Sequence, residues 1–193
     1  QMKWSPATVD QMEYDVTIPY IRQAAGPIDY TQGAMSNAAK GNYFPSNSEP
    51  MSQGTRCHQL ATYVVFESPF NMLCDAPSNY MREPESLEFI AAIPTVWDET
   101  ITLAGELGEY IIVARRSGTT WYIGGITDWN ARDLKVDLSF LGDKSYKATL
   151  FKDGVNAYRK GRDYKKETLQ LNGKQTLDLH VAPGGGFALK LEE

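Results

Sequence analysis

Residues 108–129 read GEYIIVARRSGTTWYIGGITDW, and this stretch predicts a β-hairpin. Two runs rich in β-branched and aromatic residues, Tyr110–Arg115 and Trp121–Thr127, flank a Ser-Gly turn. Similar runs follow in LKVDLSF (134–140), SYKATLFKDG (145–154), ETLQLNGKQTLDLHV (167–181) and GGGFALKL (184–191). The Asn172-Gly173 pair predicts a second hairpin. About seven short antiparallel strands in residues 95–193 are typical of a β-sandwich.

Residues before 95 have a different, mostly helical pattern. Apolar residues at helical spacing predict helices in EYDVTIPYIRQAA (13–25), GTRCHQLATYVVFESPFNMLCDAP (54–77, interrupted at Ser68-Pro69) and EPESLEFIAAI (83–93). Ile28–Tyr30 is predicted to be a short strand, followed by a long polar loop. This order is typical of βα units, but it holds too few strands to close a sheet. We therefore predict that residues 1–94 are the end of a larger α/β domain, followed by the sandwich.

Bulk properties exclude some functions. The chain has 193 residues and a formal net charge of −5, and no basic patch stands out, so a nucleic-acid partner is not expected. Apolar runs such as YIIVA are too short to span a bilayer. Residues 1–15 lack the features of a signal peptide, so we expect a piece of a longer polypeptide. Cys57 and Cys74 are expected to remain thiols, because a helix between them would separate them by about 25 Å.

Acidic residues in two segments are candidates for binding or chemistry. If Ile28–Tyr30 is a barrel strand, its C-terminal end faces the site that barrel enzymes use. The acid, aromatic ring and hydroxyl of Asp29, Tyr30 and Thr31 would suit a sugar there, whereas the alternative is that Asp29 caps a turn or the next helix. Glu13, like Asp10 and Asp15 at the start of the first predicted helix, could be a general acid or metal ligand, or could stabilise the helix N-terminus.

Other chemical groups favour structural interpretations. No second histidine follows His58 four residues later, so we predict that His58 is a hydrogen-bonded structural residue and not a metal ligand. Asp98 and Glu99 are adjacent carboxylates, but neighbours on a strand point to opposite faces and cannot flank one bond. Trp121 and Tyr122 also face opposite ways, so at least one of them is expected to pack in a core.

Several segments together resemble the C-terminal part of glycoside hydrolase family 97, the bacterial α-glucosidases and α-galactosidases. These segments are TIPYIRQAAGPIDYTQGAM (17–35), GTRCHQLATYVVFESPFNMLCDAPSNY (54–80), IPTVWDET (93–100), residues 109–129 and APGGGFALKL (182–191). The resemblance runs in order along almost the whole chain. It implies that residues 1–94 are the last units of a (β/α)8 catalytic barrel and that residues 95–193 are a C-terminal antiparallel β-sandwich domain.

The resemblance also assigns roles. Asp29 would line the sugar pocket at the mouth of a late barrel strand, with Tyr30 and Thr31 beside it and Glu13 in a nearby loop. The family's general acid precedes a Lys-Trp-Ser-like segment, here Lys3-Trp4-Ser5, so the acid would come immediately before Gln1. The second carboxylate and the calcium-binding glutamates would lie upstream. The chain would therefore carry neither a catalytic residue nor a metal ligand.

The implied function is that of a C-terminal fragment of an exo-acting α-glycosidase that hydrolyses terminal α-linked glucose or galactose. The fragment alone is expected to be inactive. The parent would use calcium and reside in the periplasm, and its partners would be the oligosaccharide substrate and the N-terminal part of the same polypeptide. The choices between glucose and galactose, and between inversion and retention, stay open. The alternative is a non-catalytic carbohydrate-binding or interaction module.

Overall fold

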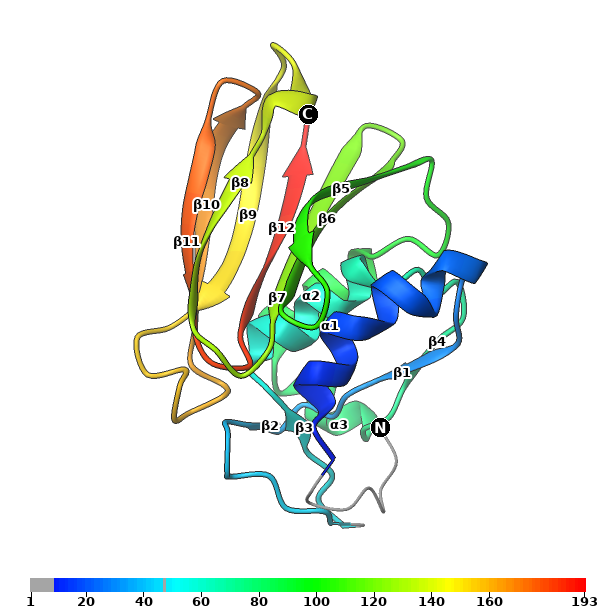
Figure 1. The fold of residues 1–193 in the computed structure, drawn as a ribbon, viewed down its shortest axis with the longest axis vertical. Helices are drawn as coiled ribbons and strands as arrows, with labels where there is room; N and C mark the ends of the chain where they lie inside the picture. Colours follow the sequence, from blue (N-terminus) through cyan, green and yellow to red (C-terminus); the bar gives the residue numbers. More distant parts are fainter. Residues whose placement is uncertain (1–8, 47) are drawn as a thin grey trace.

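The computed structural model describes residues 9–46 and 48–193 and is built on a six-stranded antiparallel sheet (Figure 1). The sheet order is β10-β9-β12-β7-β6-β5, formed by Tyr164–Asn172, Ser145–Asp153, Gly186–Glu192, Thr120–Thr127, Tyr110–Ser117 and Glu99–Glu106. A second antiparallel pair, β8 (Arg132–Asp137) and β11 (Thr176–Val181), covers one face of this sheet. The predicted antiparallel β region, including the 110–127 hairpin, is confirmed.

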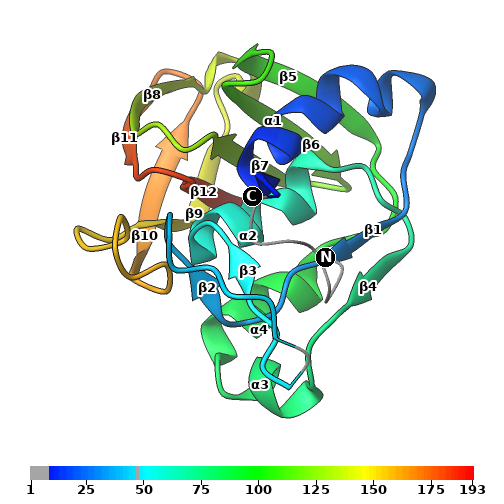
Figure 2. The same cartoon turned by 60° about the horizontal axis from the view of Figure 1, so that its bottom comes forward.

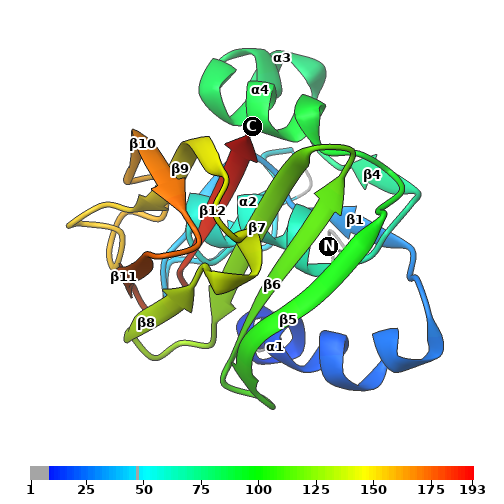
Figure 3. The same ribbon diagram turned by 90° about the horizontal axis from the view of Figure 1, so that it is seen from above.

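The central strands are buried on both faces, which explains their continuous apolar runs. In β6, Ile112 contacts the core under β8 and β11, whereas Ile111 and Val113 pack against the helices on the other face. Trp121 and Tyr122 divide in the same way, as predicted, and both are buried. The sheet is therefore the middle layer between a β pair and a helical layer (Figure 3).

The helical layer is centred on α2 (Arg56–Val65), every residue of which is buried. The Thr55 side chain accepts a hydrogen bond from the His58 N–H and so starts this helix. The other helices are α1 (Gln11–Ile21), capped by Asp10, α3 (Pro77–Met81) and α4 (Pro84–Ala92), with short 3-10 turns η1 (Gln23–Ala25) and η2 (Ser139–Leu141). No helix in the described part of the chain is long and apolar enough to cross a membrane.

Two parallel strand pairs accompany these helices. β1 (Tyr30–Gln32) pairs with β4 (Asn71–Leu73), and β2 (Asn37–Ala38) pairs with β3 (Ser52–Gln53). The predicted strand 28–30 is shifted by two residues, and β4 was not predicted, because three residues after Ser68-Pro69 are too few to show a period. With α2 between them, β1 and β4 form one βαβ unit. The closed barrel stays a proposal.

The predicted hairpin at Asn172-Gly173 is wrong. β10 pairs with β9, whereas β11 pairs with β8, so the turn carries the chain from one sheet to the other. Leu171 and Leu179 reach the same core from these two layers. An Asn-Gly turn sets a reversal of direction but does not require the flanking strands to pair.

The predicted boundary at residue 94 falls between α4 and β5, but the division into two domains stays a prediction. α2 packs on the sheet, where Leu60 and Val64 share a core with Tyr122 and Ala188. Cys57 and Cys74 do not form a disulfide, although α2 ends at Val65 and does not span the interval that the sequence argument assumed.

Gly124 sets the distance between α2 and the sheet. A Cβ atom there would lie 2.7 Å from the Ala61 carbonyl oxygen and 3.0 Å from the Val64 Cβ. We expect Gly124→Ala to lower the free energy of unfolding by about 1–3 kcal/mol, because overpacking forces backbone shifts. Urea denaturation measures this. An unchanged midpoint would mean that α2 can move away from β7 without cost.

Candidate functional site

The C-terminal ends of β1 and β4 meet at one edge, which is where α/β proteins bind ligands. The chain continues from β1 into Gly33–Asn37 and from β4 into Cys74–Ala76. The Met35 N–H donates to Asp75 Oδ2 at 2.8 Å and so joins the two segments. Asp75 Oδ1 accepts from the Ala76 N–H and from Asn79 Nδ2, both at 2.7 Å. This carboxylate therefore organises the edge.

Arg56, fully buried at the start of α2, holds the segment after β1. Its Nη2 donates to the Met35 carbonyl at 2.5 Å, and its Nε donates to Asn37 Oδ1 at 2.7 Å. Its Nη1 donates to Ser86 Oγ at 3.0 Å and to Glu83 Oε2 at 3.1 Å. A buried guanidinium needs such partners, and here they fix the edge against α4.

Gln59, one turn further along α2, completes this support. Its Nε2 donates to the Gly33 carbonyl at 2.6 Å, and its Oε1 accepts from Asn37 Nδ2 at 2.9 Å. Sequence analysis did not assign this role to Arg56 or Gln59. The available signal was two long polar side chains at i, i+3 in a predicted helix with a largely apolar second half.

A cleft of about 240 Å³ opens at this edge, and we call it the edge cleft. It is lined by Met35, Ser36, Ser48, Glu49, Pro50, Asp75, Asn79, Arg82, Glu83 and Arg162. Hydroxyl, amide, carboxylate and guanidinium groups of this kind suit the hydroxyls of a sugar. Arg162 comes from the loop between β9 and β10, so the β region also contributes. β2, β3 and α3 gather at this end of the molecule (Figure 2).

The four residues predicted to bind the sugar do not line one common site. The prediction that Asp29 lies at the C-terminal end of a strand is wrong, because exposed Asp29 precedes β1. The Tyr30 hydroxyl donates to Asp15 Oδ1 at 2.8 Å, and its ring lies 4.5 Å from Phe66, on the helix side of β1. Thr31 is half-buried and belongs to the other face. Glu13 is exposed in the first turn of α1. Their binding roles remain predictions, and Lys3-Trp4-Ser5 lies outside the described residues.

Asp15, which sequence reasoning considered only together with Asp10 and Glu13, is a buried carboxylate. It is 2% exposed, and its Oδ1 also accepts from Gln11 Nε2 at 2.8 Å. Its Oδ2 lies 3.2 Å from His58 Nε2, and His58 Nδ1 lies 3.1 Å from the Gly185 carbonyl. Burial, followed by the Asp15 charge, raises the pKa of Tyr30 well above its usual value. His58 is hydrogen-bonded, as predicted, and links α1, α2 and the turn before β12.

Asp98 and Glu99 do not point apart, contrary to the prediction. Both approach Arg116, at 3.8 Å and 3.1 Å, and Asp98 Oδ2 also accepts from the Gly118 N–H at 2.7 Å. These contacts tie the start of β5 to the β6–β7 turn, which is a structural role.

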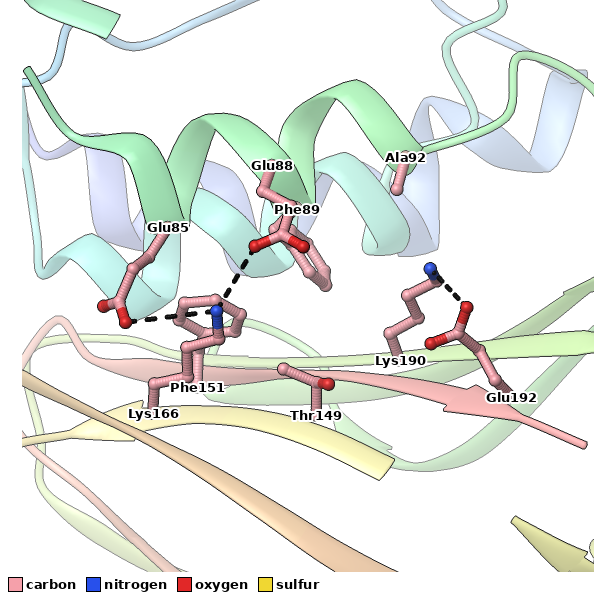
Figure 4. Close-up of a pocket in the computed structure, with 9 residues that line it drawn as sticks. All are labelled: Glu85, Glu88, Phe89, Ala92, Thr149, Phe151, Lys166, Lys190 and Glu192. Carbon is pink, nitrogen blue, oxygen red and sulfur yellow. Dashed lines mark hydrogen bonds and ion pairs between the residues drawn. The ribbon is translucent and has the colours of Figure 1, made fainter. Parts of the chain in front are cut away.

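A smaller cleft between α4 and the sheet is shown in Figure 4. Lys166 faces Glu88 at 3.4 Å and Glu85 at 3.9 Å, and the Phe89 ring lies 5.4 Å from that of Phe151. Its volume is about 70 Å³, far below the several hundred Å³ of a typical ligand site. These residues dock α4 onto the sheet.

The model of a known family matches residues 96–192, and its description is "Glycosyl-hydrolase 97 C-terminal, oligomerisation". The chain belongs to glycoside hydrolase family 97. A relative from Bacteroides thetaiotaomicron, a retaining alpha-galactosidase, is 72% identical over 192 residues. That alignment covers 100% of this chain and 29% of the relative, so the chain spans less than a third of the relative's length.

Solved structures agree with this assignment. A family 97 enzyme from Pseudoalteromonas sp. strain K8, in complex with panose, has a TM-score of 0.82 and 31% identity, over 93% of this chain and 28% of that one. A beta-arabinopyranosidase has a TM-score of 0.75 and 27% identity, over 94% of this chain and 28% of that one. The helical and β regions of this chain are therefore both shared with family 97 enzymes.

Proposed function

We propose that this chain is the C-terminal part of an exo-acting retaining α-galactosidase and builds one edge of its sugar site. The observation that supports this most is the 72% identity with a retaining alpha-galactosidase across the whole chain. Exposed Phe70, Met72 and Leu73 support a larger parent, because apolar side chains in and beside β4 suit a surface that the rest of a barrel covers.

The proposed reaction follows the retaining scheme. One carboxylic acid protonates the glycosidic oxygen while a second carboxylate attacks the anomeric carbon, and water then releases the sugar with the first residue acting as base. We place both carboxylates outside this chain, with the acid directly before Gln1. Thr31, on the face of β1 away from the helices, Asp29 just before this strand, and Glu13 remain candidates for sugar contacts. The Tyr30 hydroxyl is engaged by Asp15.

The chain's own contribution is to hold the segment that leads from the acid into α1. Gln53 Nε2 donates to the Val9 carbonyl at 2.7 Å, and Gln53 Oε1 accepts from the Gln11 N–H at 3.2 Å. One amide thus binds the start of α1 on both sides. Gln53 lies in β3, which pairs with β2 in the segment after β1. The same strand pair would therefore support both the general acid and the edge cleft.

Calcium in the parent and a periplasmic location are further proposals, based on the family resemblance. Within residues 9–46 and 48–193, no group of three or more His, Cys, Asp or Glu side chains could hold a metal ion. From the same resemblance, we propose that the calcium ligands of the parent lie upstream of this chain.

The test is an assay of the full-length parent on aryl α-galactosides and α-glucosides, with and without a calcium chelator. We expect turnover of the galactoside with retained anomeric configuration, and none by residues 1–193 alone. Turnover confined to glucosides would contradict the galactose assignment. Activity of the isolated chain would contradict the placement of the carboxylates.

An interaction module is the second candidate, favoured by the word oligomerisation in the description of the family model over residues 96–192. Light scattering of the intact parent tests it, because a dimer or larger assembly would support this role and a monomer would contradict it. Any sugar-binding test should use the whole chain, because removing α2 would expose the apolar face that carries Tyr122 and Ala188.

A further inference from the structure

The loop between β9 and β10, residues 154–163, is fixed by its own hydrogen bonds. The Gly154 N–H donates to the Asp163 carbonyl at 3.0 Å, and the Asp163 N–H donates to the Lys160 carbonyl at 2.8 Å. Asp163 Oδ2 accepts from the Asn156 N–H at 2.8 Å. The loop therefore presents its side chains from a defined backbone.

The same loop is docked against the candidate site. The Gly161 carbonyl accepts from the Arg56 N–H at 2.6 Å, and the Arg159 carbonyl accepts from Asn42 Nδ2 at 3.4 Å. A Cβ atom on Gly161 would lie 3.0 Å from the backbone of Asn37 and of Gly54. Figure 2 shows this loop beside β2. Its position relative to the edge cleft is thus set by close backbone contact.

A second cleft, which we call the basic cleft, lies between this loop and the segment after β1. Its volume is about 580 Å³, large enough for a sugar residue. It is lined by Ser36, Asn37, Ala38, Ala39, Asn42, Met51, Arg159, Lys160, Gly161, Arg162 and Asp163. Ser36 and Arg162 line both clefts, so the basic cleft continues the edge cleft.

The charged side chains of the basic cleft are mostly positive, although the formal net charge of the whole chain is −5. Arg159, Lys160 and Arg162 are exposed, and Lys160 has no ion-pair partner among the described residues. The Arg162 guanidinium is 3.8 Å from Glu83. Asp163 is the one carboxylate among the described lining residues, and it is engaged within the loop. Sequence analysis missed this patch, because its importance depends on what the loop faces.

We propose that the basic cleft binds a sugar residue bearing an anionic group, a uronic acid carboxylate or a sulfate ester, next to the terminal galactose. Guanidinium groups pair with such anions through two parallel hydrogen bonds, and the lysine adds a point charge. The inference rests on the proposed function and specifies its substrate class as terminal α-galactosides of acidic glycans.

The test compares a neutral α-galactosyl disaccharide with counterparts that carry a carboxylate or a sulfate on the second sugar, using the full-length parent. At low salt we expect kcat/KM to be about fivefold higher for at least one acidic counterpart, as expected for exposed charge pairs. The preference should vanish in R159Q/K160Q and shrink in ~1 M salt, where the Debye length is about 3 Å. The matched control, K135Q/K174Q, removes two exposed lysines outside the basic cleft and should keep the preference for the acidic substrate.

Equal kcat/KM for neutral and acidic substrates, with normal turnover of an aryl α-galactoside, would overturn the inference and leave the proposed function standing. If no α-galactoside is turned over, calorimetric titrations with a uronic-acid disaccharide and with a sulfated disaccharide still test the cleft. Binding that R159Q/K160Q weakens and K135Q/K174Q does not would support the inference. Absent binding, or binding equal in both variants, would overturn it.

Discussion

Replacing Arg56 with methionine should lower the free energy of unfolding by about 3–5 kcal/mol, because each buried acceptor left without its donor costs about 1–3 kcal/mol. The side chain is fully buried and donates to Met35, Asn37, Ser86 and Glu83. Methionine fills similar space but leaves these acceptors without their donor. Because the segment after β1 would lose its main support, kcat/KM of the parent should fall as well.

Urea denaturation and substrate kinetics measure the two effects, and R22M is the matched control. Arg22 is exposed just after α1, so its replacement should change stability by less than about 0.5 kcal/mol. If R56M and R22M unfolded at the same urea concentration, the network around Arg56 would contribute no net stability.

Raising the pH from below 4 to above 6 should lower the free energy of unfolding by about 3 kcal/mol through Asp153 alone. Each unit of pKa difference between the folded and unfolded states corresponds to about 1.4 kcal/mol. Asp153 lies at the end of β9, and its Oδ1 is buried although the residue is partly exposed. Burial raises the pKa of this carboxyl from 3.8 to about 6, against hydrogen bonds from Thr55, Ala182 and Gly186. The folded state therefore holds the proton more tightly, and this stabilisation is lost as pH rises through about 6.

D153N should remove this dependence, because an asparagine side chain does not titrate. Its amide oxygen can still accept from the Ala182 and Gly186 N–H groups, which lie 2.9 Å and 3.0 Å from the Asp153 carboxylate. The variant should match the original protein near pH 4 and exceed it in stability at pH 7–8. The difference between their unfolding free energies across this range isolates Asp153 from other carboxylates. D143N, at an exposed carboxylate, is the control. Parallel curves for D153N and the original protein would contradict the prediction.

Long strands could be predicted from the sequence, whereas features that depend on contacts between distant residues could not. The runs that became β6 and β7 carry enough apolar residues to identify them, and α4 (Pro84–Ala92) lies within the predicted helix 83–93. β4 is too short to show alternation. The Asn172-Gly173 turn has ideal local chemistry, yet which strands pair depends on the two layers that share Leu171 and Leu179.

The candidate site follows the same division. The resemblance to family 97 was predicted and is confirmed. The supporting side chains were harder to find, because Arg56 gains its role only from Met35 and Asn37, which lie about twenty positions earlier in the chain. Asp15 likewise gains its role from Tyr30 and His58.

The burial of α2 on all sides has a consequence for recombination between family members. Leu60 and Val64 pack toward the sheet, whereas the Thr62 hydroxyl donates to Gln32 in β1 at 2.6 Å. A chimera joined at residue 94 would place a foreign sheet against the resident helix, and Gly124 leaves that interface no spare room. Productive crossovers should therefore lie before β1, so that β1, the helix and the sheet are inherited together.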